Sequence, residues 1–178
     1  MEKIKNNIKE NLAIYLLIIA VIVIFLIIRF IGSTNPSLEK ELDTSLFKVV
    51  NTKEANRLFD DSEAKMLIIG SRECSATHAF VPVMQISLAK GRYNIYYLEI
   101  LDEDKKSDSY KEFVSKLDVP YNGKVEGDKE VQVKDFMGAT PMILIIKNKK
   151  VVYGSAGTVS EKELTGIANT YGVANEKS

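Results

Sequence analysis

The segment GSRECSATHAF, residues 70–80, contains the only cysteine of this 178-residue chain, Cys74. A cysteine thiolate attacks disulfides, but a single cysteine has no second sulfur with which to close a disulfide inside the chain. Three residues further on, where many redox proteins carry a second cysteine, the chain has Thr77. A threonine hydroxyl one helical turn away can stabilise a thiolate but cannot form a disulfide. If Cys74 is reactive, we therefore expect a mixed disulfide with a substrate, which only an outside thiol can release.

The neighbours of Cys74 set how readily its thiol ionises. The first turn of a helix presents unpaired N–H groups and the positive end of the helix dipole, and both favour a thiolate. Arg72 acts in the same direction, whereas Glu73 acts against it. Two plainer interpretations stay open: Cys74 is a small buried apolar residue, and Thr77 is an ordinary residue of the helix surface. His78, with no carboxylate partner in view, is expected at the surface.

Composition excludes several classes of function. The 24 basic and 24 acidic residues balance, and no run of Lys and Arg with interleaved aromatic residues is present, so we expect no binding to nucleic acid. One cysteine and one histidine cannot supply the four ligands of a structural zinc site. The acidic run 101–109 lacks the glycine and the terminal glutamate of a calcium-binding loop and is expected to be solvated. We expect neither a metal nor another cofactor.

The amino-terminal part of the chain has the pattern of a membrane anchor. The uncharged run LAIYLLIIAVIVIFLII, residues 12–28, approaches the roughly 30 Å thickness of the hydrocarbon core at about 1.5 Å per residue. No Ala-x-Ala cleavage site follows, so residues 12–31 are expected to form one uncleaved transmembrane signal-anchor in contact with membrane lipid. Lysines concentrate in residues 1–11, which places that end in the cytoplasm and the rest of the chain outside the plasma membrane.

Beyond the anchor we expect a polar linker, residues 32–45, and one folded domain, residues 46–174. Apolar runs of strand length alternate with helical patterns in this domain, which predicts an α/β fold with a mixed sheet. The segment 118–134 is expected to be an exposed loop or hairpin. The predicted strands are 46–50, 65–71, 93–100 and a hairpin built from 142–148 and 150–154, and the predicted helices are 51–61, 74–91, 107–117 and 160–172. The last helix is expected to begin with a capping box of Ser160 and Glu163.

This order of elements, with a cysteine at a strand-to-helix junction and a proline before the hairpin, resembles the thioredoxin fold. Pro82, eight residues after Cys74, matches the helix-kinking proline of that family. Thr140-Pro141 stands where the family has its cis-proline, and Gly157 matches the glycine after the last strand. Membrane-tethered thioredoxin-like proteins of Gram-positive bacteria, including those of the bacteriocin-transport accessory type, are similar in organisation. The resemblance implies that Cys74 is the attacking thiol and that Pro141 is a cis-proline facing the substrate.

Three residues depart from the family pattern. Thr77 replaces the resolving cysteine, Glu73 replaces the tryptophan before the nucleophile, and Ile68 occupies the position of a buried aspartate that serves the resolving cysteine. These changes are mutually consistent, because a protein that does not resolve its own mixed disulfide has no use for a base beside a second thiol. The segment CSAT superficially resembles the Cys-Gly-x-Thr of glutathione peroxidases, but those enzymes need a tryptophan and this chain has none.

The sequence therefore leaves two candidate functions. The first is single-thiol exchange on the thiols or disulfides of exported proteins or peptides, with Cys74, Thr77 and Pro141 as catalytic residues. The second is a redox-inert adapter that binds a polypeptide edge by backbone pairing. In either case the residues expected to border the bound polypeptide are Arg72, Glu73, Thr140 and Gly157.

Overall fold

The computed structural model describes residues 42–60, 62–91, 93, 95–100, 104–123 and 130–173. The expected anchor and almost all of the expected linker lie outside these residues. None of the helices in the described part of the chain is long and apolar enough to cross a membrane. The elements, in chain order, are β1 (Lys48–Val50), α2 (Thr52–Arg57), β2 (Lys65–Gly70), α3 (Ser75–Gly91), β3 (Ile95–Glu99), η1 (Asp104–Lys106), α4 (Asp108–Ser115), η2 (Val133–Phe136), β4 (Met142–Lys147), β5 (Lys150–Ala156) and α5 (Glu161–Tyr171).

The strands form one mixed sheet of five strands, in the order β1-β3-β2-β4-β5. A mixed sheet is what the sequence predicted. β1, β3 and β2 run parallel, β4 is antiparallel to β2, and β5 is antiparallel to β4. The central strands β2 and β4 are buried along almost their whole length. This burial on both faces explains why they are continuous apolar runs and not alternating ones.

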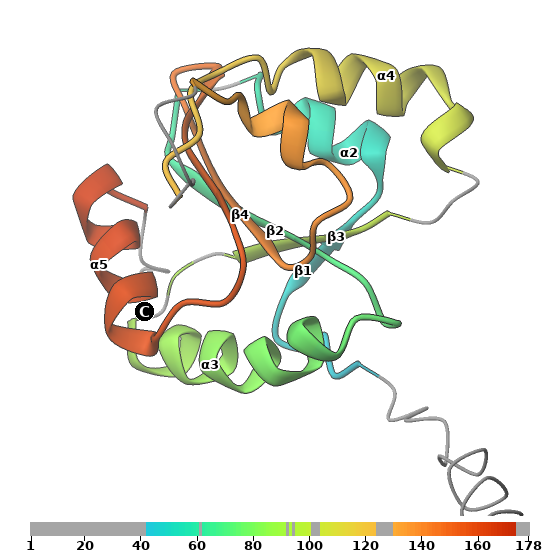
Figure 1. Ribbon diagram of the computed structural model, residues 1–178. Coiled ribbons are helices and arrows are strands. Elements are labelled where there is room, and N and C mark those ends of the chain that lie inside the picture. The colour runs from blue at the N-terminus through green and yellow to red at the C-terminus, as the bar shows by residue number, and fades with distance from the viewer. Residues whose placement is uncertain are drawn as a thin grey trace, which may run out of the picture. The chain divides into compact units, whose positions relative to one another are not determined.

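Helices cover both faces of the sheet (Figure 1). α3 and α5 pack on one face, and α2 and α4 pack on the other. Successive residues of β4 point to opposite faces, so Ile143 and Ile145 join the cluster under α3 and α5, whereas Met142, Leu144 and Ile146 join the cluster under α2 and α4. The two clusters together form the core.

Side-chain caps fix where three of the helices begin. The side chains of Asn51 and Ser160 each accept a hydrogen bond from the backbone N–H three residues further on. The glutamate at that third position in turn accepts a hydrogen bond from the backbone N–H of the capping residue. These capping boxes satisfy N–H groups that have no partner within the helix. The capping box predicted at Ser160 is thereby confirmed. Ser107 caps α4 in the same way without the returning bond.

The predicted hairpin is also present, and its turn is formed by Asn148 and Lys149. Both residues have positive φ, 52° and 64°. A two-residue turn of this kind matches the twist of the paired strands, which is why it is favoured in hairpins.

Several boundaries differ from the prediction. α2 ends at Arg57 and α3 begins at Ser75, so Cys74 is the residue before the helix and not part of its first turn. The segment 118–134 was expected to be an exposed loop or hairpin. The antiparallel bridge between Pro120 and Gln132 agrees with a hairpin, but Val133 is fully buried and not exposed. Residues 124–129 within that segment lie outside the described part of the chain. Folded contacts begin before residue 46, because Leu42 already packs against the core.

Candidate thiol site at the start of helix α3

Cys74 lies in the short loop that joins the end of β2 to the start of α3. Its backbone N–H donates to the carbonyl of Ser71, and its own carbonyl accepts the first bond of the helix, from His78. Cys74 is thus the N-cap of α3. Its side chain is partly buried, neither deep in the core nor fully exposed. The interpretation of Cys74 as a buried apolar residue does not describe this position.

The Cys74 thiol contacts a segment that lies 66 residues later in the chain. It donates a hydrogen bond to the carbonyl oxygen of Thr140, with Sγ and the oxygen 3.2 Å apart. The following peptide bond, Thr140–Pro141, is cis, as the resemblance implied, and Pro141 is buried. Gly157 donates its N–H to the carbonyl of Pro141 at 2.7 Å and has a φ of +99°, a conformation that favours glycine. The fold therefore brings Cys74, Thr140, Pro141 and Gly157 together.

Thr77 is fully buried, so it is not a residue of the helix surface. Its hydroxyl oxygen accepts a hydrogen bond from the N–H of Ser71 at 3.4 Å. Its hydroxyl and its backbone N–H are both among the groups that lower the pKa of Cys74. A hydroxyl that accepts on one side still has its own proton available to a charged sulfur.

These contacts lower the pKa of Cys74 below its ordinary value. Burial is the largest single influence and acts to raise this pKa, but hydrogen bonds to the charged sulfur outweigh it. They come from the side chain of Thr140, from the backbone and hydroxyl of Thr77, and from the backbone of Ala76. Only the protonated thiol can donate to the Thr140 carbonyl. On ionisation the sulfur therefore loses this hydrogen bond and instead accepts hydrogen bonds from several donors.

Arg72 is held by a residue that the sequence analysis did not single out. Glu99, at the end of β3, accepts two hydrogen bonds from the Arg72 guanidinium, at 2.8 Å and 2.7 Å, and a third from the Arg72 backbone N–H at 2.9 Å. Hydrogen bonds from the Arg72 side chain keep the pKa of Glu99 below its usual range, although burial opposes them. Glu99 reaches the loop because β2 and β3 are parallel and the carboxyl ends of such strands lie at one edge of the sheet, a pairing that no local pattern around Glu99 indicates.

His78 and Glu73 stand at the rim of the site. The Nε2 atom of His78 lies 2.7 Å from the carbonyl oxygen of Arg72. A carbonyl only accepts, so this nitrogen carries the proton and donates. His78 is half-buried and fixes the loop, which differs from the expectation of a plain surface residue. Glu73 is exposed, and its backbone N–H donates to the Ser71 hydroxyl.

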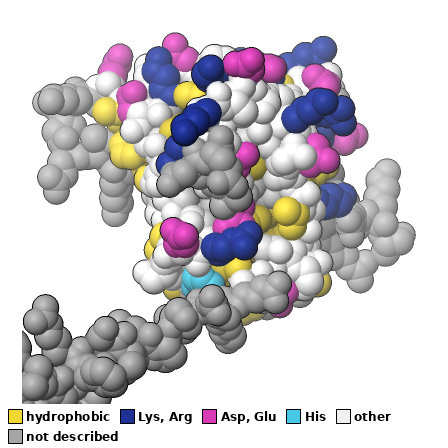
Figure 2. Space-filling view, turned by 90° about the vertical axis from the view of Figure 1, so that its right-hand side faces the viewer, with side chains coloured by type: hydrophobic (Ala, Val, Ile, Leu, Met, Phe, Trp, Pro, Cys, Tyr) yellow, Lys and Arg dark blue, Asp and Glu magenta, His cyan; other side chains and the backbone are white. Residues whose placement is uncertain are grey.

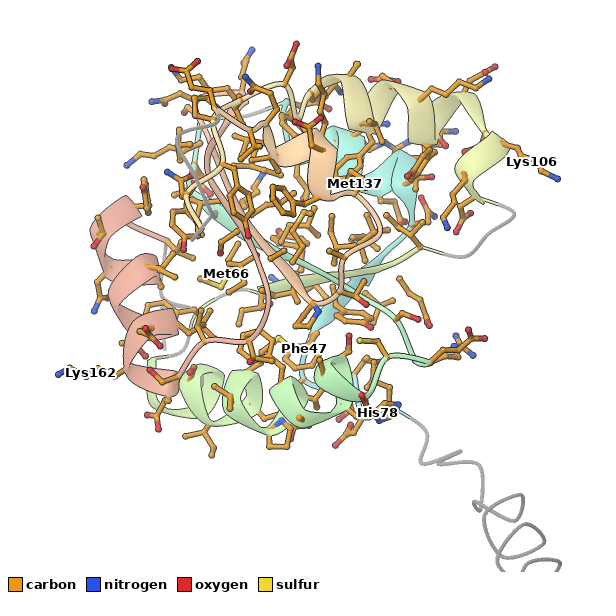
Figure 3. The ribbon with its side chains drawn as sticks, in the orientation of Figure 1. Phe47, Met66, His78, Lys106, Met137 and Lys162 are labelled. Carbon is orange, nitrogen blue, oxygen red and sulfur yellow. The ribbon has the colours of Figure 1, made fainter. Side chains whose placement is uncertain are left out.

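The surface around the loop carries charges of both signs. Figure 3 shows His78 beside the first turn of α3. Figure 2 views the molecule from the side that lies at the right of Figure 1 and shows acidic and basic side chains interspersed, with the histidine at the lower edge of this face. This face therefore has no visible excess of one sign of charge.

Tyr97 of β3 is a second residue that the sequence analysis missed. Its ring is 1% exposed and stacks on that of Phe47, with the ring centroids 6.1 Å apart. Its hydroxyl lies against Gly70 and beside Thr77. Burial, followed by the nearby charge of Glu99, raises the pKa of Tyr97 well above its ordinary value, so this phenol stays protonated. No local pattern marks it, since a tyrosine in a strand is typical of an ordinary core residue.

The strand order and the cis-proline before the hairpin define an α/β protein with a thioredoxin-like fold. Its site carries one sulfur, with a buried threonine hydroxyl beside it. A scan against models of known protein families finds no match, and neither does a search of curated proteins.

Solved structures of thioredoxins are similar to the chain. Thioredoxin-2 of the malaria parasite, described as a component of that parasite's protein secretion machinery, is 18% identical, with 62% of this chain and 84% of that chain covered and a TM-score of 0.39. Mitochondrial thioredoxin 3 of Saccharomyces cerevisiae, in its oxidized form, is 12% identical, with 70% and 96% covered and a TM-score of 0.46. Plasmodium falciparum thioredoxin is 12% identical, with 70% and 98% covered and a TM-score of 0.44. The assignment of the fold rests on the chain's own topology and not on these distant likenesses.

Proposed function

We propose that this protein carries out single-thiol exchange with disulfides, using Cys74 as the attacking group. The observation that carries the proposal is the position of the sulfur, partly exposed at the start of α3 and 3.2 Å from the carbonyl before a cis-proline. The hydrogen bonds from Thr77, which lower the pKa of the thiol, also support it. A thiolate at neutral pH is the form that attacks disulfides.

The exchange proceeds in two balanced steps. The Cys74 thiolate attacks one sulfur of a substrate disulfide, a new bond forms between those two sulfurs, and the second substrate sulfur leaves as a thiolate that takes a proton from water. An outside thiol, either a small-molecule thiol or a reduced protein cysteine, then attacks the mixed disulfide. Cys74 leaves as a thiolate, and the outside thiol retains the bond to the substrate. Thr77 stabilises the charge on the Cys74 sulfur in both steps but forms no bond.

The substrates we propose are exported proteins or peptides, met outside the plasma membrane. The support for this location is the uncharged run 12–28 and the lysines of residues 1–11, which favour a single anchor with the folded domain on the outer side. Residues that border the substrate in this proposal are Arg72, Glu73, Thr140 and Gly157. Backbone pairing next to Thr140 would hold an extended polypeptide across the sulfur.

The test uses the full-length chain, in which every thiol adduct must lie on Cys74 because there is no other cysteine. Alkylation rates measured across pH give the pKa of the thiol, which we expect below the ordinary value of about 8.5. In cells, a membrane-impermeant alkylating reagent should label Cys74 from outside, and non-reducing gels should show protein-sized adducts that disappear on reduction.

Two variants serve as controls. Cys74→Ser should abolish both labelling and adducts. Cys74→Ser with Ser62→Cys moves the only thiol to an exposed loop, and this thiol should titrate at the ordinary pKa and trap no specific partner. If Cys74 titrates at or above the ordinary value and traps nothing, the exchange proposal is wrong. The protein is then a redox-inert adapter with the same fold, the second function carried from the sequence.

A further inference from the structure

The Tyr97 hydroxyl is buried and has no hydrogen-bond partner anywhere in the described part of the chain. Its residue is 1% exposed. Buried tyrosine hydroxyls usually have a partner, because leaving a polar group without one inside a protein costs free energy. Tyr93, on the same face of the sheet, follows this rule, since its hydroxyl donates to Asn169 Oδ1 at 2.7 Å. The unpartnered hydroxyl of Tyr97 therefore requires an explanation.

Its position lies directly beneath the thiol site. A methyl group built on Gly70 would lie 2.5 Å from the Tyr97 hydroxyl oxygen and 2.8 Å from Cγ2 of Thr77. Both groups thus occupy the space over Gly70, the last residue of β2, at the point where the chain turns toward Cys74. Tyr97 pairs with Val49 of β1 and with Ile68 of β2, and neither paired residue has a polar side chain. The stacked Phe47 ring fixes the phenol in this direction.

The polar groups around the sulfur change roles when it ionises. In the thiol form, the Cys74 S–H donates to the Thr140 carbonyl and needs no further donor. A thiolate cannot donate; it accepts several hydrogen bonds, and Thr77 and the helix N–H groups supply some of them. An unused donor held beside Thr77 is what a newly charged sulfur requires. This also accounts for the absence of a partner in the thiol form.

We propose that Tyr97 is a positioning residue for Cys74, whose hydroxyl donates a hydrogen bond to the sulfur, directly or across one water, when the sulfur becomes a thiolate. The inference rests on the proposed exchange function, which it deepens by naming the group that stabilises the attacking and leaving thiolate from inside the fold. A water can bridge the two because Tyr97, Thr77 and the sulfur together offer it three polar partners. The other titratable and charged groups in or next to the loop that carries the thiol are Glu99 on β3, Arg72 and Glu73 in the loop, and His78 on α3.

The test compares Tyr97→Phe with Tyr93→Phe in the full-length chain. Tyr97 lies in β3 and Tyr93 lies just before it in the chain, and each change removes one buried hydroxyl. Only Tyr97 lies beside Thr77. We expect Tyr97→Phe to raise the pKa of Cys74 by about half a unit to one unit, which slows alkylation at pH 7 by roughly threefold to tenfold because the rate follows the thiolate fraction. Tyr93→Phe should leave the pH profile of alkylation unchanged.

Melting temperatures at a pH below the thiol titration seen in the alkylation profile provide the second measurement. Tyr97→Phe removes an unpartnered hydroxyl and should leave the melting temperature unchanged or higher, whereas Tyr93→Phe breaks a hydrogen bond and should lower it. A Tyr97→Phe protein with the wild-type alkylation profile overturns the proposal, and so does one that melts as low as Tyr93→Phe, since its hydroxyl would then have a partner already. If Tyr97→Phe shifts the profile but wild-type Cys74 forms no mixed disulfides, the exchange function fails and the role of Tyr97 stands.

Discussion

Replacing Gly70 by alanine probes whether the thiol site is packed as described. The added methyl group would lie 2.5 Å from the Tyr97 hydroxyl, 2.8 Å from Tyr97 Cε2 and 2.8 Å from Thr77 Cγ2. Carbon atoms in contact normally stay about 3.5–4.0 Å apart, so all three distances are far too short. Neither neighbour can easily yield, because Thr77 is fully buried and the Tyr97 ring is held against Phe47.

The expected cost follows from the general behaviour of overpacked cores. An extra methyl group in a close-packed interior lowers the free energy of unfolding by about 1–3 kcal/mol. Because Gly70→Ala makes three contacts with immobile atoms, we expect a loss of about 2–3 kcal/mol. For a domain of this size the melting temperature should fall by roughly 6–15 °C. Thermal unfolding of the full-length chain in mild detergent, followed by near-ultraviolet circular dichroism of the tyrosines, measures this fall. Adding Tyr97→Phe removes the shortest contact and should recover part of it.

Gly166→Ala is the matched control, because the same chemical change meets nothing within 4 Å at that position. Gly166 is exposed in the interior of α5, where alanine is the better helix former, so the control should gain roughly 0.5–1 kcal/mol. The two substitutions thus have opposite expected signs. A Gly70→Ala protein that melts within a degree or two of wild type would refute the described packing of Tyr97 and Thr77 over Gly70.

Two further substitutions test features outside the sulfur itself. The pKa of Glu99 lies below its ordinary value of 4.5, so its ion pair with Arg72 stabilises the fold above about pH 4.5 and loses this effect as the pH falls through the lower, folded-state pKa. Glu99→Gln should therefore lower the melting temperature at pH 7, and this loss should shrink as the pH is lowered further and further below 4.5. An equal loss at every pH would contradict the assignment. Lys149 has a φ of 64° in the hairpin turn, and Lys149→Gly should relieve this conformation and gain roughly 0.5–1 kcal/mol, with no gain in melting temperature counting against the turn.

Most of the fold could be predicted from local pattern. Continuous apolar runs marked β2 and β4, and the capping box of Ser160 and Glu163 marked the start of α5. Such signals are strong because burial and capping act on neighbouring residues in the chain. The boundaries that shifted, at Cys74 and at the end of α2, lie where local preference is weak and packing decides. The buried Val133 was missed because its neighbours in sequence are polar.

The site was predicted only in part. Cys74 and Thr77 could be named from residue type and spacing, and Thr140 and Pro141 from the resemblance to the thioredoxin fold. Glu99 and Tyr97 could not be named in the same way, since nothing in their own segment distinguishes a carboxylate or a phenol that faces the site from one that faces solvent or core. Both lie on β3, and only its pairing with β2 brings them to the loop before α3.

The sequence by itself determined that one thiol would stand at a strand-to-helix junction without a second sulfur to resolve it, because that depends only on which residues are present and on local periodicity. Tertiary structure alone decided what surrounds that thiol. The carbonyl of Thr140 and the side chains of Tyr97 and Glu99 reach the loop from separate strands and turns. Distances between such segments are set by sheet register and core packing, which no local stretch of residues encodes.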